Sequence, residues 1–265
     1  MNGIPILLYH SVGDDASGPL GAYTSSLGDF RAQMGWVADE GFTTLTVRSY
    51  TEALEGGRPL PERPLLITFD DGLADFSRNA LPVLQSFGHT CTMFVTTAVT
   101  WHRRPRSLGG RRTLSWSEIR TLQLAGVELG AHSHDHLQLD LLPASRVASQ
   151  LRVCKDLLEQ ETQSEVHSFA YPHGYQRATT RRLVERAGFA SACAVKNELS
   201  HSQDNRWALA RVMLTSDQSV PFLRTAFSSA GLPLARTSER PRTTAWRAAR
   251  LLRTRGRPLI TAGWI

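Results

Sequence analysis

The strongest constraint on the fold is an alternation of two kinds of segment along most of the chain. Short apolar runs, many of them β-branched, alternate with longer segments whose apolar residues recur at helical spacing. The expected strands are Ile4–Tyr9, Phe42–Val47, Leu65–Phe69, Thr90–Thr96, Val127–Ala131, His167–Ala170, Phe189–Ala194 and Trp207–Leu214. Strands separated by helices in this way predict an α/β fold with a parallel sheet. About seven to eight such units favour a distorted (β/α) barrel over an open sheet.

The expected helices have recognisable starts and stops. They lie at Leu27–Glu40, Asp75–Phe87, Pro143–Glu161 and Arg177–Ala187. A further helix is expected to begin at Ser115, because Ser115 and Glu118 have the spacing of a capping box, and to end at Gly126. Residues 97–112 are expected to form a longer loop that lies over one mouth of the barrel.

Length and charge indicate one globular domain followed by a basic extension. The chain has 265 residues, 41% of them hydrophobic, and a net charge of +6. Residues 236–265 contain eight arginines and one acid and so carry +7, which leaves −1 for residues 1–235. We therefore expect a catalytic domain over 1–235 and an Arg-rich extension over 236–265. The extension has the composition of a segment that contacts an anionic membrane surface, or of a poorly ordered tail. Nucleic-acid binding is not expected, because no motif accompanies the charge.

The sequence also predicts a cytoplasmic location. No run reaches the roughly 18–20 apolar residues of a membrane span. The first residues lack a basic region and reach Tyr9 and His10 before a signal core forms. Cys91, Cys154 and Cys193 are scattered and form no CxxC pair, as is usual in a reducing compartment. Nothing in the sequence indicates an oligomeric state.

Polar residues follow three of the expected strands at the point where each strand ends. His10 follows the first, Asp70 and Asp71 follow the third, and His132 follows the fifth. The carboxyl ends of parallel barrel strands share one face, where barrels of this kind place their chemistry. We therefore expect these side chains to meet in one site.

The spacing of two histidines suggests a metal site. His132 and His136 are four residues apart, so on one helical turn their side chains would converge on one ion. A carboxylate from another strand would complete three protein ligands and leave positions open for water and substrate. One of the two adjacent aspartates would bind the ion, and the other would be free to move a proton. Histidines at this spacing are common without a metal, but the Asp-Asp-Gly run after a strand favours one.

These motifs resemble those of a known family. Thr-Phe-Asp-Asp-Gly at 68–72 and His-Ser-His-Asp-His at 132–136 are similar to the first two motifs of the polysaccharide deacetylase family. The family is also called the NodB homology domain or carbohydrate esterase family 4, and its fold is a distorted (β/α) barrel. The resemblance covers residues 4–230. It implies that Asp70 is the catalytic base and that the metal ligands are Asp71, His132 and His136. Zinc is the favoured ion, and cobalt, manganese and nickel also suit this ligand set.

A third motif departs from the family pattern. Phe-Ala-Tyr-Pro-His-Gly at 169–174 has Ala170 where many members have an arginine that orients the base. The resemblance therefore implies that Asp70 has another partner, for which Arg211 near the last strand is a candidate. By the same resemblance the backbone N–H of His173 would donate to an oxyanion.

The acid expected from the resemblance lies at the start of the chain. The usual late histidine has no clear counterpart, since His201 lies in a polar Ser-His-Ser run. Leu-Leu-Tyr-His at 7–10 resembles the first strand of circularly permuted members that act on exopolysaccharide, in which the acid histidine precedes the Asp-Asp motif. This implies that His10 protonates the departing amine.

Together with the metal site, the resemblance implies a metal-dependent carbohydrate N-deacetylase. Its substrate would be an N-acetylated aminosugar in a polysaccharide, an oligosaccharide or a glycoconjugate. Two alternatives stay open. One is an amide hydrolase on the same scaffold that acts on a small molecule, as a deformylase, a cyclic imidase or a natural-product deacetylase. The other is a non-catalytic carbohydrate-binding protein, against which the retained base, ligands and candidate acid argue.

Overall fold

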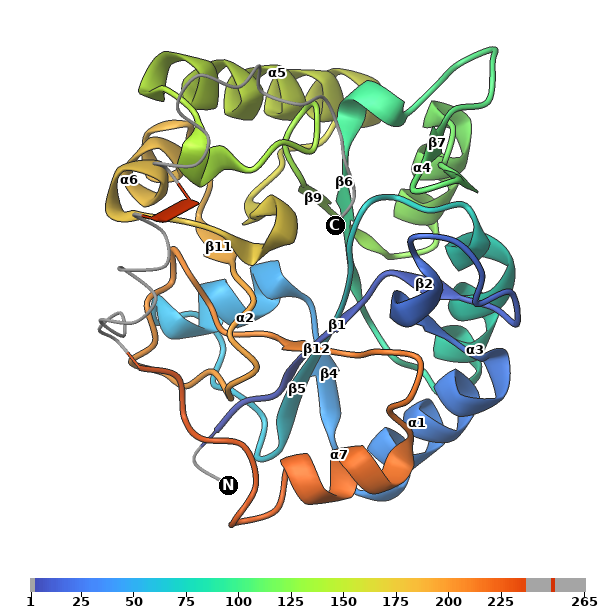
Figure 1. Cartoon of the computed structure of the whole chain (residues 1–265). Coiled ribbons are helices and arrows are strands. Elements are labelled where there is room, and N and C mark those ends of the chain that lie inside the picture. The colour runs from blue at the N-terminus through green and yellow to red at the C-terminus, as the bar shows by residue number, and fades with distance from the viewer. Residues whose placement is uncertain (1–2, 237–248, 251–265) are drawn as a thin grey trace.

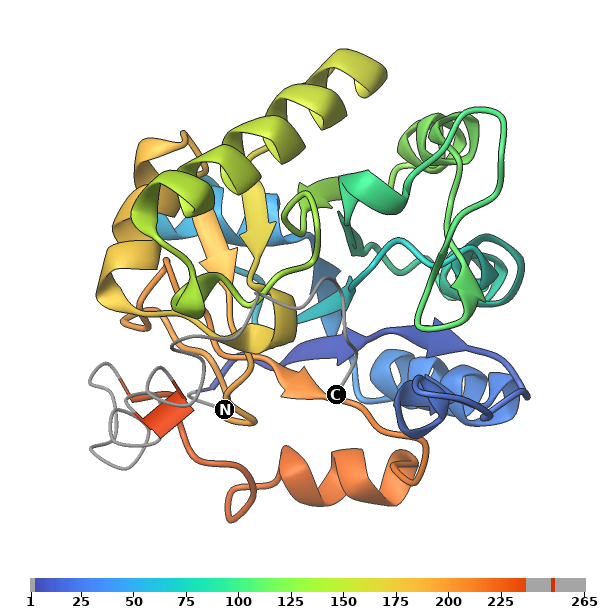
Figure 2. The same ribbon diagram turned by 45° about the horizontal axis from the view of Figure 1, so that its top comes forward.

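A curled parallel sheet forms the centre of the molecule, and helices cover its outer surface (Figure 1, Figure 2). The computed structural model describes residues 3–236 and 249–250. Over these residues the main sheet has eight strands: β1 (Ile6–Tyr9), β4 (Thr43–Leu45), β5 (Pro64–Phe69), β6 (Thr92–Val95), β9 (Glu128–Ala131), β10 (Ser168–Ala170), β11 (Ser191–Cys193) and β12 (Val212–Met213). Seven follow the order β11-β10-β9-β6-β5-β1-β12, and β4 pairs with β5. Every pairing within this sheet is parallel, as predicted.

The two ends of this strand order meet through the segment that precedes β12. Cys193 of β11 forms a parallel bridge with Leu209. The amide of Leu209 donates to the carbonyl of Ala192 at 2.8 Å. Farther along, the same segment pairs with β1, where Leu7 lies opposite Val212. The sheet curls back on itself, so the predicted distorted (β/α) barrel is confirmed.

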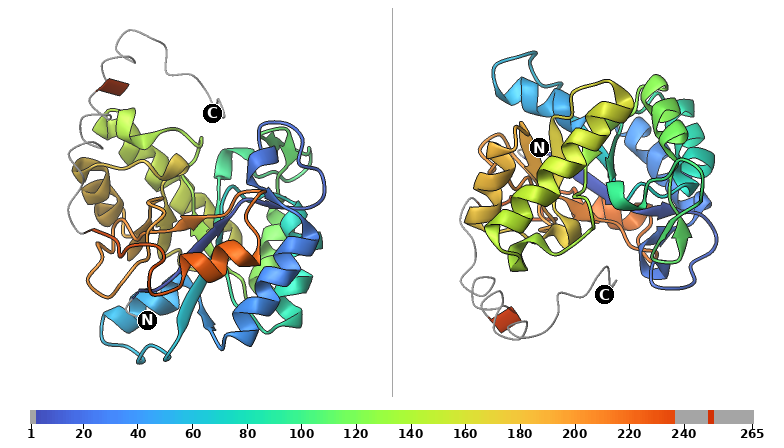
Figure 3. Two further views of the ribbon diagram at one scale, coloured as in Figure 1. Left: turned by 60° about the horizontal axis from the view of Figure 1, so that its bottom comes forward. Right: turned by 90° about the horizontal axis from the view of Figure 1, so that it is seen from above.

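Helices connect the strands and pack on the outside of the sheet. They are α1 (Leu27–Asp39), α2 (Val47–Leu54), α3 (Leu81–Ser86), α4 (Trp116–Leu124), α5 (Ala144–Thr162), α6 (Ala178–Arg186) and α7 (Val220–Ala226) among the described residues. Shorter turns are η1 (Gly21–Tyr23), the π-helical η2 (Phe76–Ala80), η3 (Thr97–Val99), η4 (Leu139–Leu141) and η5 (Pro172–Gly174). Two small ladders are β2 (Ser11–Val12) with β3 (Thr24–Ser25), and β7 (Ser107–Leu108) with β8 (Arg111–Arg112). Figure 3 shows the long α5, in yellow-green, lying along one flank of the barrel.

The predicted elements agree with this architecture. All eight predicted strands are present, although several are shorter than their apolar runs. The capping box is confirmed, because the amide of Glu118 donates to Ser115 Oγ and the amide of Ser115 donates to the Glu118 carboxylate. The helix expected over 75–87 begins as the π-helical turn η2. The apolar pattern does not predict α2, because its cap residue, Thr46, lies inside a run that also suits a strand. It does not predict the short α7 either.

Alternate residues of each strand face opposite sides of the sheet. Ile6, Leu66 and Phe94 belong to a cluster inside the barrel, whereas Leu7 and Ile67 belong to the larger cluster between the sheet and the helices. The same alternation continues past the strand ends. Residues 10, 70 and 132 therefore start on the inner side, at the mouth of the barrel.

No helix of the described residues is long and apolar enough to cross a membrane. Most of the predicted Arg-rich extension lies outside the described residues, which include only Arg236, Ala249 and Arg250 from it. The boundary near residue 235 and the membrane contact of the extension therefore stay predictions.

Gly130 in β9 makes room for an aromatic ring in the barrel interior. A Cβ atom at Gly130 would lie 2.5 Å from Cδ1 of Phe94 and 3.1 Å from the carbonyl oxygen of Ser168. We predict that Gly130→Ala lowers the free energy of unfolding by about 1–3 kcal/mol, because the ring and the neighbouring strand have to move.

Gly28→Ala in α1 is the matched control, since a Cβ atom there has only Ser26 Oγ as a neighbour, at 3.9 Å. Alanine favours a helix over glycine, so this variant should be as stable as wild type or more so. Urea unfolding of the two variants measures the difference, and an unchanged midpoint for Gly130→Ala would contradict the tight packing.

Candidate metal centre and active site

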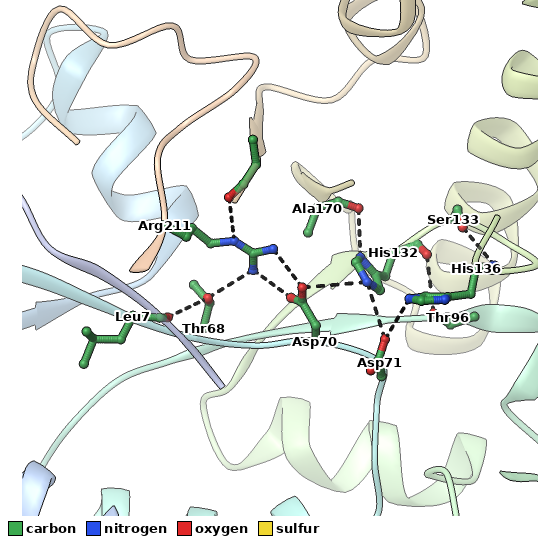
Figure 4. A network of polar contacts seen from close by, with 11 residues as sticks. Leu7, Thr68, Asp70, Asp71, Thr96, His132, Ser133, His136, Ala170 and Arg211 are labelled. Carbon is green, nitrogen blue, oxygen red and sulfur yellow. Dashed lines mark hydrogen bonds and ion pairs between the residues drawn. The ribbon is translucent and has the colours of Figure 1, made fainter. Parts of the chain in front are cut away.

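Three ligand groups converge at the carboxyl ends of β5 and β9. Asp71 follows β5, whereas His132 and His136 follow β9. One ligand atom from each lies within 4.8 Å of the others, and all three residues are buried. Nε2 of His136 lies 3.1 Å from Oδ1 of Asp71, and Nε2 of His132 lies 3.5 Å from the same oxygen (Figure 4). The structure thus brings together the three ligands expected from the sequence.

The chemistry of this group fits a divalent cation. Both carboxylate oxygens of Asp71 are buried, and no donor in the described part of the chain has hydrogen-bond geometry with either. Burial raises the pKa of Asp71, but the nearby histidines, His136 foremost, lower it further and hold that pKa well below its usual value. An ionised, buried carboxylate beside two imidazoles is a typical ligand set for a metal that binds nitrogen and oxygen.

A hydrogen bond to the backbone orients the His132 ring. Its Nδ1 lies 2.8 Å from the carbonyl oxygen of Ala170, which only accepts, so Nδ1 carries the hydrogen. Nε2 then presents a lone pair toward Asp71. Burial lowers the pKa of His132 to about 4, so the ring is neutral near pH 7. A neutral imidazole held through its second nitrogen is poised to bind a cation.

The loop that carries the two histidines is not helical. The spacing predicts one helical turn, but Ser133 has a φ of 64° and His136 a φ of 56°. That prediction is wrong, because the left-handed backbone folds the loop back and the amide of His136 donates to Ser133 Oγ at 3.1 Å. Asp71 and His173 also have positive φ, at 77° and 58°. Such conformations cost free energy outside glycine, and their concentration here is typical of a functional site.

Side chains of neighbouring elements brace this loop. Oε1 of Gln150, on α5, accepts from the amide of Asp135 at 2.7 Å, and Nε2 of Gln150 donates to Asp135 Oδ2 at 2.8 Å. The ring of His134 contacts Thr97 Oγ1 at 2.8 Å and is not part of the ligand group. Sequence reasoning does not find Gln150, because no motif surrounds it.

Asp70 forms a two-pronged ion pair with Arg211. Nη1 and Nη2 lie 2.7 Å from Oδ1 and Oδ2, and both side chains are buried (Figure 4). Burial by itself raises the pKa of Asp70, but the charge and hydrogen bond of Arg211, together with the nearby His132 and His10, hold that pKa below its usual value. The guanidinium also donates to Thr68 Oγ1 and to the carbonyl of Ala194, each at 3.2 Å. Its position is therefore fixed on several sides.

The arginine that pairs with Asp70 is Arg211, whereas the family motif has its arginine at the position of Ala170, on a different strand. Ala170 lies on β10, and its carbonyl serves His132 instead. Arg211 directly precedes β12 and crosses the barrel interior over Phe94, with 5.4 Å between the guanidinium carbon and the ring centroid. Ala170 and Cys193 belong to the same inner cluster as Phe94, and their small side chains leave volume for the arginine.

His10 lies beside Asp70 at the same end of the barrel. Tyr9 pairs with Phe69, and the amide of Asp70 donates to the carbonyl of Tyr9 at 3.0 Å, so the residues that follow are neighbours. Burial lowers the pKa of His10, while the carboxylates of Asp71 and Asp70 act in the opposite direction. Nδ1 of His10 is buried without a hydrogen-bond partner among the described residues.

His173 borders the same mouth from η5. Its ring centroid lies 4.8 Å from that of His136. Burial lowers the pKa of His173 to about 3, and His136 acts in the same direction. The next residue, Gly174, has a φ of 72°, and a Cβ atom there would lie 2.5 Å from Cβ of Val195. The turn is thus held against residue 195, and all six predicted site residues lie at one mouth of the barrel.

Comparison with known proteins agrees with this geometry. The family model described as polysaccharide deacetylase matches residues 57–192. A putative polysaccharide deacetylase of Bacillus subtilis, YxkH, is 26% identical over 216 residues, which are 82% of this chain and 73% of that protein. The poly-β-1,6-N-acetyl-D-glucosamine N-deacetylase of Escherichia coli is 35% identical over 88 residues, which are 32% of this chain and 13% of that protein.

Solved structures share the fold. The Streptococcus pyogenes deacetylase PplD, in complex with acetate, superposes with a TM-score of 0.73 at 21% identity, over 83% of this chain and 96% of that one. IcaB from Ammonifex degensii superposes with a TM-score of 0.67 at 23% identity, over 93% of this chain and 97% of that one. The family match spans half of the chain and includes both the Asp-Asp-Gly run and the paired histidines. The chain therefore belongs to the polysaccharide deacetylase family and is a carbohydrate N-deacetylase.

Proposed function

We propose that the chain hydrolyses the N-acetyl group of N-acetylglucosamine units in an exopolysaccharide, or in oligosaccharides derived from one. The observation that carries this proposal is the buried convergence of Asp71, His132 and His136 beside the ion pair of Asp70 with Arg211. The relative in E. coli is named for the deacetylation of poly-β-1,6-N-acetyl-D-glucosamine, which supports this substrate class. The amide C–N bond breaks, and the products are acetate and a free amine.

In this proposal Asp71, His132 and His136 hold the metal, and zinc is the first candidate. Two imidazole nitrogens and a carboxylate oxygen are a common zinc ligand set, and cobalt, manganese and nickel accept the same ligands. A divalent ion bound there acts as a Lewis acid toward the acetyl carbonyl and makes water more acidic. The remaining tasks, moving two protons and holding the developing negative charge, fall to the chain's own side chains and backbone.

Asp70 takes the proton of the attacking water. Arg211 keeps this carboxylate ionised and fixes its direction, while each oxygen retains a further lone pair. Asp71 faces the two histidines, so it is engaged with the metal centre. Asp70 is therefore the carboxylate that can act as general base.

His10 and His173 have the two remaining roles, proton donation to the leaving amine and stabilisation of the oxyanion. As the C–N bond breaks, the electron pair stays on nitrogen and the imidazolium of His10 donates its proton there. Burial makes this imidazolium a stronger acid, because it disfavours the charged form. The backbone N–H of His173 donates to the oxygen that gains charge when water adds to the carbonyl.

We predict that Asp70→Asn lowers acetate release from an N-acetylglucosamine tetrasaccharide by about 10²–10⁴-fold, because an amide cannot accept the proton of water. His10→Ala should lower it in the same range, and both variants should keep the metal content of wild type. Asp71→Asn should lose metal and activity together. Enzymatic acetate assays and atomic absorption measure the two quantities.

His201→Ala is the matched control for His10→Ala, because His201 is the other histidine considered as the acid and its Nε2 contacts the carbonyl of Ala235. It should retain full activity. Full activity of His10→Ala would contradict the assignment of the acid. Absence of acetate release by metal-loaded wild type from any N-acetylated oligosaccharide would contradict the proposed substrate class.

We predict that Arg211→Met raises the pKa of Asp70, because burial then acts without a compensating cation. In wild type the lowered pKa of folded Asp70 stabilises the fold above the unfolded pKa, and this contribution disappears as pH falls through the folded pKa. In the variant the acid limb of the pH–rate profile should move to higher pH. The free energy of unfolding at pH 7 should fall by about 3–5 kcal/mol, since a buried charge loses its partner.

Arg206→Met is the matched control, because Arg206 pairs with Glu55 at the surface, where the two side chains are 45% and 49% exposed. Its unfolding free energy should change by less than about 1 kcal/mol, and its acid limb should not move. Acetate release against pH and urea unfolding test both variants. If the pH–rate profile of Arg211→Met coincides with that of wild type, the proposed role of Arg211 in keeping Asp70 ionised is contradicted.

A further inference from the structure

Arg250, from the Arg-rich stretch near the end of the chain, docks on the barrel beside the metal centre. Figure 1 draws its short segment in red near α6. Nη1 lies 3.0 Å from Oδ2 of Asp140, and Nη2 donates to Oε1 of Gln138. The guanidinium carbon lies 4.1 Å from the ring centroid of Tyr175. The Arg250 side chain is 14% exposed and that of Asp140 is 0% exposed, so the contact is largely sealed from water.

The groups around this guanidinium are those that recognise a cation. A carboxylate supplies the opposite charge, an amide oxygen accepts a charge-assisted hydrogen bond, and an aromatic face attracts positive charge. Asp140 is buried in η4, where an ionised carboxylate is favourable only with cations or donors around it. The backbone therefore places Asp140, Gln138 and Tyr175 around a position suited to a positive group.

This position adjoins the candidate metal centre. Asp140 follows the ligand His136 by four residues. The ring centroid of Tyr175 lies 6.1 Å from that of His173, which in turn lies 4.8 Å from that of His136. The ring of His173 thus contacts both the aromatic residue of the cation position and a metal ligand. A polymer bound with one unit at the metal centre would bring a neighbouring unit toward Tyr175.

We propose that Gln138, Asp140 and Tyr175 form a cation subsite for the ammonium group of an already deacetylated sugar unit, and that Arg250 is an internal competitor for it. The inference rests on the proposed function, because that reaction turns a neutral acetamide into an amine that is protonated near pH 7. The ammonium would replace the guanidinium against Asp140, and the apolar face of the sugar ring would pack on Tyr175. Displacing Arg250 returns rotamer freedom to a long side chain, which favours the exchange.

Binding of a glucosamine tetrasaccharide to the full-length, metal-loaded protein tests the subsite without turnover, since this ligand carries no acetyl group. We expect Arg250→Ala to tighten its Kd, because the competitor is removed. In the Arg250→Ala background, Asp140→Asn should weaken the Kd by about tenfold, the loss of a charge-assisted hydrogen bond. The same Asp140→Asn substitution should change the KM for acetate release from the N-acetylglucosamine tetrasaccharide by less than about twofold. This ligand carries no cation, so it makes no charge-assisted hydrogen bond that the substitution could remove.

Two further variants keep the test decisive. Arg224→Ala removes an equal charge from α7, where Arg224 is exposed, and should leave both constants unchanged. Tyr175→Leu removes the aromatic face and should weaken binding of the glucosamine tetrasaccharide severalfold. This variant tests the subsite independently if thermal unfolding shows that Asp140→Asn does not fold.

The outcomes separate the subsite from the proposed function. Weaker binding of the glucosamine tetrasaccharide by Arg250→Ala would overturn the inference, because Arg250 would then bind sugar itself. Equal weakening of both tetrasaccharides by Asp140→Asn would also overturn it, because the residue would then be only structural. If Asp140→Asn does not distinguish the glucosamine tetrasaccharide from the N-acetylglucosamine tetrasaccharide while wild type still releases acetate, the subsite alone is contradicted. Absence of acetate release with Asp140-dependent binding intact contradicts the proposed function and supports the subsite.

Discussion

The pairing of Asp70 with Arg211 inside the barrel is the interaction on which the rest of the site depends. A guanidinium removed from water is unfavourable unless anions and hydrogen-bond acceptors surround it. Here the carboxylate of Asp70, the hydroxyl of Thr68 and the carbonyl of Ala194 do so. Thr68 lies in β5, Asp70 directly follows it and Ala194 directly follows β11, while Arg211 leads into β12. The ion pair therefore joins strands near the place where the sheet curls back on itself.

This pairing divides the work of two adjacent carboxylates. Asp70 continues the inward alternation of β5 and is committed to Arg211. Asp71 has a φ of 77°, and this left-handed turn points its carboxylate toward His132 and His136 instead. Both aspartates stay ionised although both are buried, one because of a permanent cation and the other because of imidazoles that suit a metal. One strand end thus carries a proton acceptor and a metal ligand side by side.

Much of this could be predicted from local patterns. The eight strands follow from apolar runs, and the Ser115 capping box follows from two residues at a fixed spacing. Placing His10, Asp70 and His132 at one mouth needs only the parallel order of the strands. The conformation of the histidine loop could not be predicted, because a spacing of four suits a helical turn and a folded-back loop equally. The hydrogen bond from the His136 amide to Ser133 distinguishes them.

By itself the sequence determined the eight strands of the sheet and their parallel arrangement, five of the seven described α-helices, and the group of residues able to hold a metal. These features follow from periods of two and 3.6 residues and from short motifs, which act over a few neighbouring positions. Only the tertiary structure decided which cation faces Asp70, since Arg211 lies 141 residues away and meets it through closure of the sheet. It alone also placed Arg250 beside Tyr175 and Asp140. Contacts between such distant residues depend on how the whole barrel packs, and no local pattern specifies them.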